Sequence, residues 1–431
     1  MNQLFLQLKS LIQKVKIASG ILDRRVYTGP WYVQVDLTNQ CNNNCIACWC
    51  NSPLLGNQRM DSKTKSKTLP FERVLHLIDE LNDMGVREIH FTGGGEPFMH
   101  PRILDIIKHA KNKGLAVGMN TNFTLVDRET ARQIVDFRMD HMIISLWAAT
   151  PETYVELHPN QSKETFKALA DTLDYIHQLK LQMGTPFPRI EMYNVINIYN
   201  YHELHQMLEF AYRHHMDAIT FTPVDTVLGK TDELAVSGGA KRELIKSLEN
   251  LPHSASVLDK KFPHHEIAIH YDIFHQRIVK SNSVDYDGSF LESMPSCYAG
   301  WNFARVLANG DVNSCLKSFK MPVGNILDNR FKDIWLGGLQ NRFRRHTIDY
   351  DYQDPFFKNM GNDRFADDQG CYKCCDNLEM NLSIHSQIST LGSKTQKMLK
   401  VLGRTHNRSE AVRISSKGRM KPDIDREDTG C

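Results

Sequence analysis

Residues 31–50 read Trp31-Tyr-Val-Gln-Val-Asp-Leu37-Thr38-Asn-Gln-Cys41-Asn-Asn-Asn-Cys45-Ile-Ala-Cys48-Trp-Cys50. An apolar run that predicts a strand therefore leads straight into a loop with three closely spaced cysteines. A cubane iron–sulfur cluster has four irons and prefers thiolate ligands, so three thiolates leave one iron able to bind another molecule. The alternative for three such cysteines is a zinc ion with a fourth ligand such as Cys50.

A glycine-rich motif, Thr92-Gly-Gly-Gly-Glu-Pro97, follows a second predicted strand, residues 88–91. Glycines let the backbone approach a ligand closely, and the carboxylate of Glu96 can accept hydrogen bonds from an ammonium group. The cysteine spacing and this Gly-Gly-Glu-Pro element together resemble the signatures of the radical SAM enzymes. The resemblance implies that a 4Fe-4S cluster on Cys41, Cys45 and Cys48 chelates S-adenosylmethionine. It implies that Gly93, Gly94, Gly95 and Glu96 hold the methionyl amino group of that cofactor.

The chain also shows strand patterns in alternation with amphipathic helices such as 70–84 and 101–113. The expected strands cover residues 31–37, 88–91, 115–121, 141–146, 189–196 and 218–223. This alternation predicts an α/β fold of parallel βα units, and the family's partial (β/α)6 barrel agrees with the number of strands. Ligands bind at the carboxyl ends of such strands, where the cysteine loop and the glycines would emerge.

Three further polar residues are expected at those strand ends. Asn120 and Asn122 would face the ribose or carboxylate of the cofactor, although asparagine is also an ordinary turn residue. Ser145 is a third candidate for cofactor binding. Trp147 stands where many relatives have an aspartate; it can stack on a ring of the substrate or simply pack in the core.

A second cysteine group lies near the C-terminus. The turn Asn309-Gly310 between Cys297 and Cys315 predicts a β-hairpin that brings both thiols to one end, and Cys371 and Cys374 can complete four ligands. This pattern resembles the twitch domain, a shorter form of the SPASM domain, and implies one auxiliary 4Fe-4S cluster for electron transfer. A structural zinc ribbon is the alternative. Cys50, Cys375 and Cys431 are left unassigned, as ordinary reduced thiols or, for one of them, as a hydrogen-atom donor to a substrate radical.

The expected domain organisation has five parts. An N-terminal amphipathic helix (1–30) precedes the radical SAM partial barrel (31–235), a bridging segment (236–296) and a small hairpin and helix domain of the twitch/SPASM type (297–385). A basic, flexible tail (386–431) is expected to follow. The N-terminal helix is expected to pack on the barrel, with peripheral contact to an anionic membrane as the less favoured alternative.

Composition indicates a cytoplasmic enzyme. The formal charge is +2, which provides no electrostatic basis for nucleic-acid binding, and ten cysteines without an export signal favour metal ligation over disulfides. No run of residues is apolar and long enough to cross a bilayer.

The resemblance implies reductive cleavage of S-adenosylmethionine to a 5'-deoxyadenosyl radical, which abstracts a hydrogen atom from the substrate, with the auxiliary cluster accepting a second electron. The expected reaction is net oxidation of a small molecule such as a sugar or aminocyclitol, with electrons from an external flavodoxin or ferredoxin. His264, His265, His270 and His275 are candidate bases for the hydroxyl proton. The alternatives are a peptide or protein maturase that forms a crosslink or oxidised side chain, and a non-catalytic metal-binding scaffold.

Overall fold

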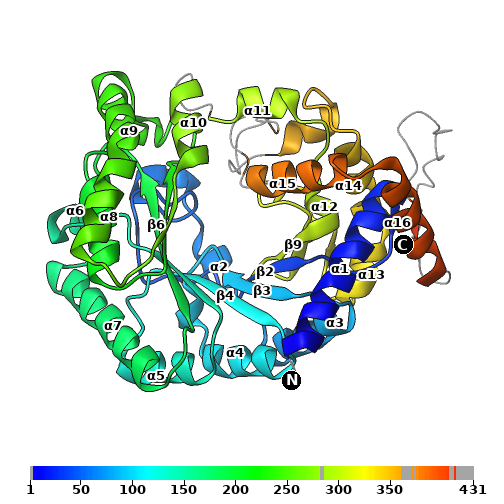
Figure 1. Cartoon of the computed structure of the whole chain (residues 1–431), viewed down its shortest axis with the longest axis horizontal. Coiled ribbons are helices and arrows are strands. Elements are labelled where there is room, and N and C mark those ends of the chain that lie inside the picture. Colours follow the sequence, from blue (N-terminus) through cyan, green and yellow to red (C-terminus); the bar gives the residue numbers. More distant parts are fainter. Residues whose placement is uncertain are drawn as a thin grey trace.

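A ten-stranded sheet forms the centre of the protein (Figure 1). The computed structural model describes residues 3–281, 286–360, 371, 375, 377–406 and 412–413. The strands follow the order β11-β10-β9-β2-β3-β4-β5-β6-β7-β8. They are β2 (Tyr32–Asp36), β3 (Glu88–Thr92), β4 (Ala116–Thr121), β5 (His141–Ser145), β6 (Arg189–Ile196), β7 (Ala218–Pro223), β8 (Ala268–His270), β9 (Phe303–Val306), β10 (Asp311–Asn313) and β11 (Gly324–Asn325).

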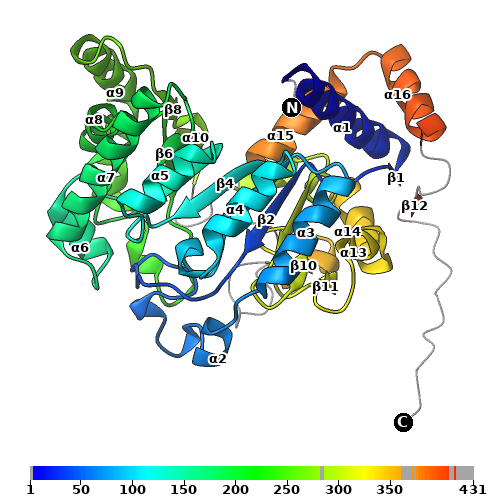
Figure 2. The same ribbon diagram turned by 90° about the horizontal axis from the view of Figure 1, so that it is seen from below.

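Strands β2 to β7 are the six expected strands, and all pair in parallel. Helices α3 (Phe71–Asp83), α4 (Ile103–Asn112), α5 (Arg128–Asp136), α7 (Lys163–Gln182) and α8 (Leu204–Arg213) cover the outer face of the sheet (Figures 1 and 2). Helix α3 shows why: Val74, Leu77, Ile78 and Leu81 recur at helical spacing and are fully buried. The partial (β/α)6 barrel predicted from the sequence is therefore confirmed.

The other helices are α1 (Gln3–Asp23), α2 (Ser62–Lys65), α6 (Pro151–Leu157), α9 (Gly238–Lys261), α10 (Asp272–Lys280), α11 (Gly288–Ser293), α12 (Ala299–Asn302), α13 (Phe331–Leu336), α14 (Gly338–Ile348), α15 (Leu378–Ser389) and α16 (Ser393–His406). Helix α9 lies within the segment expected to bridge the barrel and the C-terminal domain, residues 236–296. Among the described residues, no helix is long and apolar enough to cross a membrane.

The predicted hairpin is present as β9 and β10, which pair antiparallel around Gly310. Gly310 has a φ of +91°, a conformation that favours glycine. The sequence did not predict where the hairpin lies: β9 pairs in parallel with β2, with Tyr32 opposite Phe303 and Val35 opposite Val306. One continuous sheet therefore leads into the first cysteine loop, after β2, and into Cys315, after β10.

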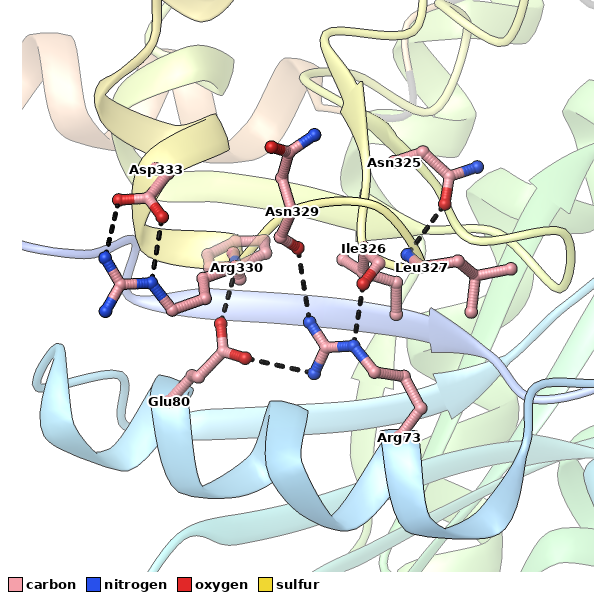
Figure 3. A network of polar contacts seen from close by, with 9 residues as sticks. Arg73, Glu80, Asn325, Ile326, Leu327, Asn329, Arg330 and Asp333 are labelled. Carbon is pink, nitrogen blue, oxygen red and sulfur yellow. Dashed lines mark hydrogen bonds and ion pairs between the residues drawn. The ribbon is translucent and has the colours of Figure 1, made fainter.

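A polar network ties α3 to the segment that follows β11 (Figure 3). The Arg73 guanidinium donates to the carbonyl oxygens of Ile326 (2.7 Å) and Asn329 (3.5 Å), and pairs with Glu80 at 3.0 Å. Glu80 in turn accepts a hydrogen bond of 2.5 Å from the backbone N–H of Phe331, at the start of α13. These contacts attach residues 326–331 to helix α3 on the outside of the barrel. The pairing of β9 with β2 attaches the same C-terminal domain to the barrel sheet.

Helix α1 lies beside α16, as both views show (Figures 1 and 2). Its Ile17 and Ile21 join the main core, and the buried Gln13 side chain donates to the carbonyl of Gly29 (3.0 Å). The helix thus packs on the barrel. Residues 393–406, expected in a flexible tail, are helical, and β12 (Val412–Arg413) pairs with β1 (Arg25–Val26).

Candidate active site and auxiliary thiol site

One cavity of about 340 Å³ lies at the carboxyl ends of the parallel strands. It forms there because loops after β2, β3, β4 and β5 leave the sheet at the same edge. Its lining includes every residue expected around the first cluster and its cofactor: Cys41, Cys45, Cys48, Gly93, Gly94, Gly95, Glu96, Asn120, Asn122 and Ser145.

Backbone N–H groups in the cysteine loop point at the sulfurs. The N–H of Asn43 donates to Cys41 Sγ (3.4 Å) and that of Asn51 donates to Cys48 Sγ (3.3 Å). The Cys50 thiol lies 3.6 Å from Cys48 Sγ, and this hydrogen bond is the main reason that the pKa of Cys48 falls to about 7. Burial raises the pKa of Cys41 to about 11. Donors of this kind stabilise thiolates, which are the form that binds iron.

Within the described residues, no three His, Cys, Asp or Glu side chains are close enough together to hold a single metal ion. Cys50 is only 3 % exposed and does not line the cavity, because its Sγ is directed toward Cys48 and the Gly94 carbonyl (3.5 Å).

Gly95 presses against the start of the cysteine loop. A Cβ atom at this position would lie 2.1 Å from the carbonyl oxygen of Gln40, which is backbone and cannot move aside cheaply. The same carbonyl accepts a hydrogen bond from the N–H of Glu96 at 2.8 Å. The glycine-rich motif therefore sets the position of the cysteine loop.

Glu96 is 2 % exposed and joins the loops after β3 and β4. Its carboxylate accepts hydrogen bonds from the Thr121 hydroxyl (2.7 Å), the Phe98 N–H (3.1 Å) and the Asn122 N–H (2.7 Å). Burial nevertheless raises its pKa from 4.5 to about 7. A cationic ligand in the cavity would supply a compensating positive charge.

Asn122 reaches from the end of β4 to the cysteine loop. Its Nδ2 donates to Asn42 Oδ1 (2.9 Å) and lies 4.0 Å from Cys41 Sγ. Asn120 is held differently, because its Oδ1 lies 2.5 Å from Nε2 of the buried His90. Ser145 lines the cavity from the end of β5.

Trp147 combines three unusual features. Its φ is +61°, its side chain is 9 % exposed at the cavity wall, and its indole Nε1 has no hydrogen-bond partner among the described residues. The backbone is held in place by Asn200, whose Nδ2 donates to the Trp147 carbonyl (2.8 Å). An unpaired buried N–H costs free energy, so the indole is a ready donor for a ligand.

Sequence reasoning missed the charged residues that connect the barrel to the C-terminal segment. Asp36, at the end of β2, accepts two hydrogen bonds from Arg305 on β9 (3.1 and 2.8 Å), and both side chains are buried. The buried Lys317 forms an ion pair with the partly exposed Asp225, which follows β7. The available signal was a charged residue in or at the end of an apolar run: Asp36 after Tyr-Val-Gln-Val, and Arg305 within Phe-Ala-Arg-Val.

The second cysteine group also comes together. Cys297, Cys315 and Cys375 are each less than 10 % exposed and share one apolar cluster, against which Cys371 packs. Amide donors face two of the sulfurs: Asn377 Nδ2 lies 3.4 Å from Cys315, and Asn381 Nδ2 lies 3.5 Å from Cys297. Burial raises the pKa of Cys375, and the three neighbouring thiols raise it further. The predicted ligand Cys374 lies outside the described residues, as does Cys431.

None of the four histidines proposed as bases lines the cavity that contains Cys41 and Glu96. His270 lies on β8 opposite Thr220, and with His90 and Glu88 it lines a different cavity. His265 packs against the rings of Tyr212 and His215.

A parallel α/β barrel with three thiols and a glycine-rich loop at its strand ends, joined to a second set of cysteines, defines an iron–sulfur enzyme. Residues 35–211 match the model of the radical SAM superfamily, and residues 297–375 match SPASM, an iron-sulfur cluster-binding domain. The chain is a radical SAM enzyme with a C-terminal SPASM domain. It thus uses a 4Fe-4S cluster with S-adenosylmethionine, and its SPASM domain implies auxiliary iron–sulfur clusters.

Relatives are diverse in what they act on. The tungsten-containing aldehyde ferredoxin oxidoreductase cofactor-modifying protein of Pyrococcus furiosus is 22 % identical over 80 % of this chain and 94 % of that protein. A GTP 3',8-cyclase of Chlorobaculum tepidum is 30 % identical, but over only 36 % of this chain and 44 % of that protein. The chain therefore spans less than half of that cyclase.

Solved structures share the fold at low identity. SuiB of Streptococcus suis bound to S-adenosylmethionine has a TM-score of 0.57 at 14 % identity, over 80 % of this chain and 73 % of that one. Native anSMEcpe with bound AdoMet has a TM-score of 0.55 at 12 % identity, over 87 % of this chain and all of that one.

Proposed function

We propose that this enzyme oxidises a small polar molecule, such as a sugar or aminocyclitol, by two electrons. When bound, the cluster and S-adenosylmethionine supply a 5'-deoxyadenosyl radical that abstracts a hydrogen atom. An auxiliary cluster held by the C-terminal cysteines would accept the second electron from the substrate radical, and a base or water would take the proton, so that an alcohol becomes a ketone. An external cytoplasmic donor of the flavodoxin or ferredoxin type supplies the electron for cofactor cleavage.

In this proposal, Cys41, Cys45 and Cys48 hold the first cluster. The buried carboxylate of Glu96 balances the cationic methionyl end of the cofactor, and its raised pKa is consistent with a carboxylate that needs a cationic partner. Gly93, Gly94 and Gly95 let the backbone approach that end closely, while Asn120, Asn122 and Ser145 offer polar groups to the rest of the molecule.

The observation that carries the electron-transfer role is the shared cavity wall. Leu316 and Arg305, both from the C-terminal domain, line the same cavity as Cys41 and Glu96. Leu316 directly follows Cys315 in the chain. A substrate in this cavity would therefore lie between the first thiol group and an auxiliary thiol, which suits successive hydrogen-atom and electron removal.

Charged groups at this wall favour a compact polar substrate. Arg305 and Asp225 both line the cavity, and Lys317 is hydrogen-bonded to Asp225. The unpaired Trp147 indole N–H adds a further donor to the cavity wall. Donors and acceptors in one small cavity match hydroxyl and amino groups on a ring.

Peptide maturation is the second candidate function. A PqqA peptide cyclase of Bradyrhizobium diazoefficiens is 28 % identical over 27 % of this chain, and a solved structure of SuiB bound to precursor peptide SuiA shares the fold. Perdeuterated sugars and aminocyclitols distinguish the candidates, because hydrogen abstraction transfers deuterium into 5'-deoxyadenosine. Deuterium transfer from such a ring supports the proposed substrate class, whereas transfer only from a peptide library supports a maturase.

The first experiment tests the metal sites. Anaerobic reconstitution of the wild type is expected to give about eight irons per chain and dithionite-driven cleavage of S-adenosylmethionine. The variant Cys41→Ala/Cys45→Ala/Cys48→Ala is expected to keep about four irons and lose cleavage. Zinc in place of iron, or loaded protein that forms no 5'-deoxyadenosine, would instead indicate a non-catalytic scaffold.

A further inference from the structure

Cys375 occupies a buried position that no ligand assignment above includes. Its side chain is 7 % exposed and belongs to the same apolar cluster as Cys297 and Cys315, with Cys371 packed against that cluster. The sequence spacing favours Cys374, the residue that completes a Cys-x2-Cys pair with Cys371, and leaves Cys375 as a spare thiol.

The backbone of Cys375 is fixed by a buried ion pair. Its N–H donates to Asp287 Oδ2 (2.6 Å), and its carbonyl oxygen accepts from Arg277 (3.0 Å). Arg277 also binds Asp287 through two hydrogen bonds of 2.7 and 2.9 Å, and the Asp287 side chain is fully buried. A buried ion pair is stable only with good geometry, so Cys375 has a well-defined place in the fold.

The surrounding polar groups are arranged around thiolates. Asn377 and Asn381 direct amide N–H groups at Cys315 and Cys297, and the Lys317 N–H donates to Cys315 Sγ (3.5 Å). Asn377 follows Cys375 by two residues, and Asn381 lies on helix α15, which begins at Leu378. Residues 375–381 therefore supply one thiol and also the amide donors that face Cys315 and Cys297. Donors to ligand sulfurs orient the ligands and tune the reduction potential of a cluster.

We propose that Cys375, rather than Cys374, supplies the fourth thiolate of the auxiliary cluster, together with Cys297, Cys315 and Cys371. This inference rests on the auxiliary cluster of the proposed function. Cys374 would then be a thiol outside the ligand set.

The test uses the full chain with Cys41→Ala/Cys45→Ala/Cys48→Ala as the parent, so that only auxiliary iron is counted. Cys375→Ser and the matched control Cys374→Ser are each added to this parent and reconstituted anaerobically. The parent and the Cys374→Ser variant are expected to hold about four irons and to give the same electron paramagnetic resonance spectrum after reduction. The Cys375→Ser variant is expected to lose the cluster or to give a changed spectrum.

A second measurement avoids variants that fail to fold. The reconstituted parent is alkylated, and fragment masses locate the label on Cys374 or Cys375. Labelling of Cys374 with protection of Cys375, and labelling of both after chelation and denaturation, support the proposal. Protection of Cys374 alone, loss of iron from Cys374→Ser, or an unchanged spectrum in Cys375→Ser would overturn it. A parent that binds no iron at all would overturn the auxiliary cluster itself, which is a different failure.

Discussion

Arg305, on the hairpin strand β9, donates two hydrogen bonds to the buried carboxylate of Asp36 at the end of β2. The two residues are 269 positions apart, and Arg305 lines the cavity. Burial raises the pKa of Asp36, while the Arg305 charge and hydrogen bonds oppose that rise. The ionised form of the buried Asp36 carboxylate is therefore stabilised by the presence of Arg305.

We expect Arg305→Leu to lower the free energy of unfolding by about 3 to 5 kcal/mol, because it leaves the Asp36 carboxylate buried and unpaired. Urea denaturation of the apo protein measures this change. Arg330→Ala, which breaks an exposed pair with Asp333, is the control and should leave the midpoint unchanged. Equal changes in the free energy of unfolding for the two substitutions would show that the buried pair stabilises the fold no more than the exposed one.

Gly95→Ala should destabilise the apo protein by about 1 to 3 kcal/mol, because the new Cβ overlaps the Gln40 carbonyl oxygen. It should also reduce the amount of iron bound by the cysteine loop, because the new Cβ displaces Gln40, the residue before Cys41. Gly338→Ala is the matched control, since no heavy atom lies within 4 Å of a Cβ there. Iron counts and thermal midpoints of both variants check the prediction, and an unchanged Gly95→Ala protein would contradict it.

Glu96 predicts a pH dependence of stability. Because its folded-state pKa is raised from 4.5 to about 7, the folded apo protein binds more protons than the unfolded chain between these values. Its contribution is present at low pH and is lost as the pH rises through about 7. Between pH 5 and 8, the wild type should lose about 2 to 3 kcal/mol more than Glu96→Gln, measured by urea unfolding. The pKa of Glu88 is also raised to about 7, but Glu88 is present in both proteins and does not contribute to the difference between them. If the free energy of unfolding of the two proteins changed with pH in the same way, the prediction would be refuted.

Trp147→Phe removes the unpaired indole N–H while keeping an aromatic ring at the cavity wall. We expect the thermal midpoint to be unchanged or slightly higher, since an unsatisfied buried donor is lost, worth about 1 kcal/mol. Cleavage of S-adenosylmethionine without substrate should be retained, while the KM for the substrate should rise. A loss of cofactor cleavage would place the indole at the cofactor instead.

The sequence predicted the parallel strands well because each is a short apolar run between turn residues. The bounds of β6 and β7 agree with the expected ones, and the helix at α3 differs by one residue at each end. Strand β8 escaped notice because it has only three residues, two of them exposed. The strand ends also predicted the cavity lining, since parallel topology alone brings them together.

Long-range relationships were beyond the sequence. Nothing local indicates that β9 pairs with β2, or that Arg305 meets Asp36, because hydrogen bonding between strands depends on the path of the whole chain. For Trp147 the sequence left stacking on the substrate and packing in the core both open, and it indicated neither the positive φ nor the unpaired N–H. The Cys-x2-Cys spacing favours Cys374 and remains a prediction, whereas the anchoring of Cys375 by the buried Arg277 and Asp287 depends on residues 98 and 88 positions away in the sequence.

The pairing of β9 with β2 has a consequence during synthesis. A ribosome releases β2 long before residues 303–306 exist, so the nascent barrel carries an open strand edge with unpaired N–H and C=O groups. Such an edge is a template for aggregation, and a chain truncated before residue 303 would keep it permanently. The C-terminal domain thus acts as a cover for the barrel's own edge, and cells that make the fragment alone should deposit it in inclusion bodies.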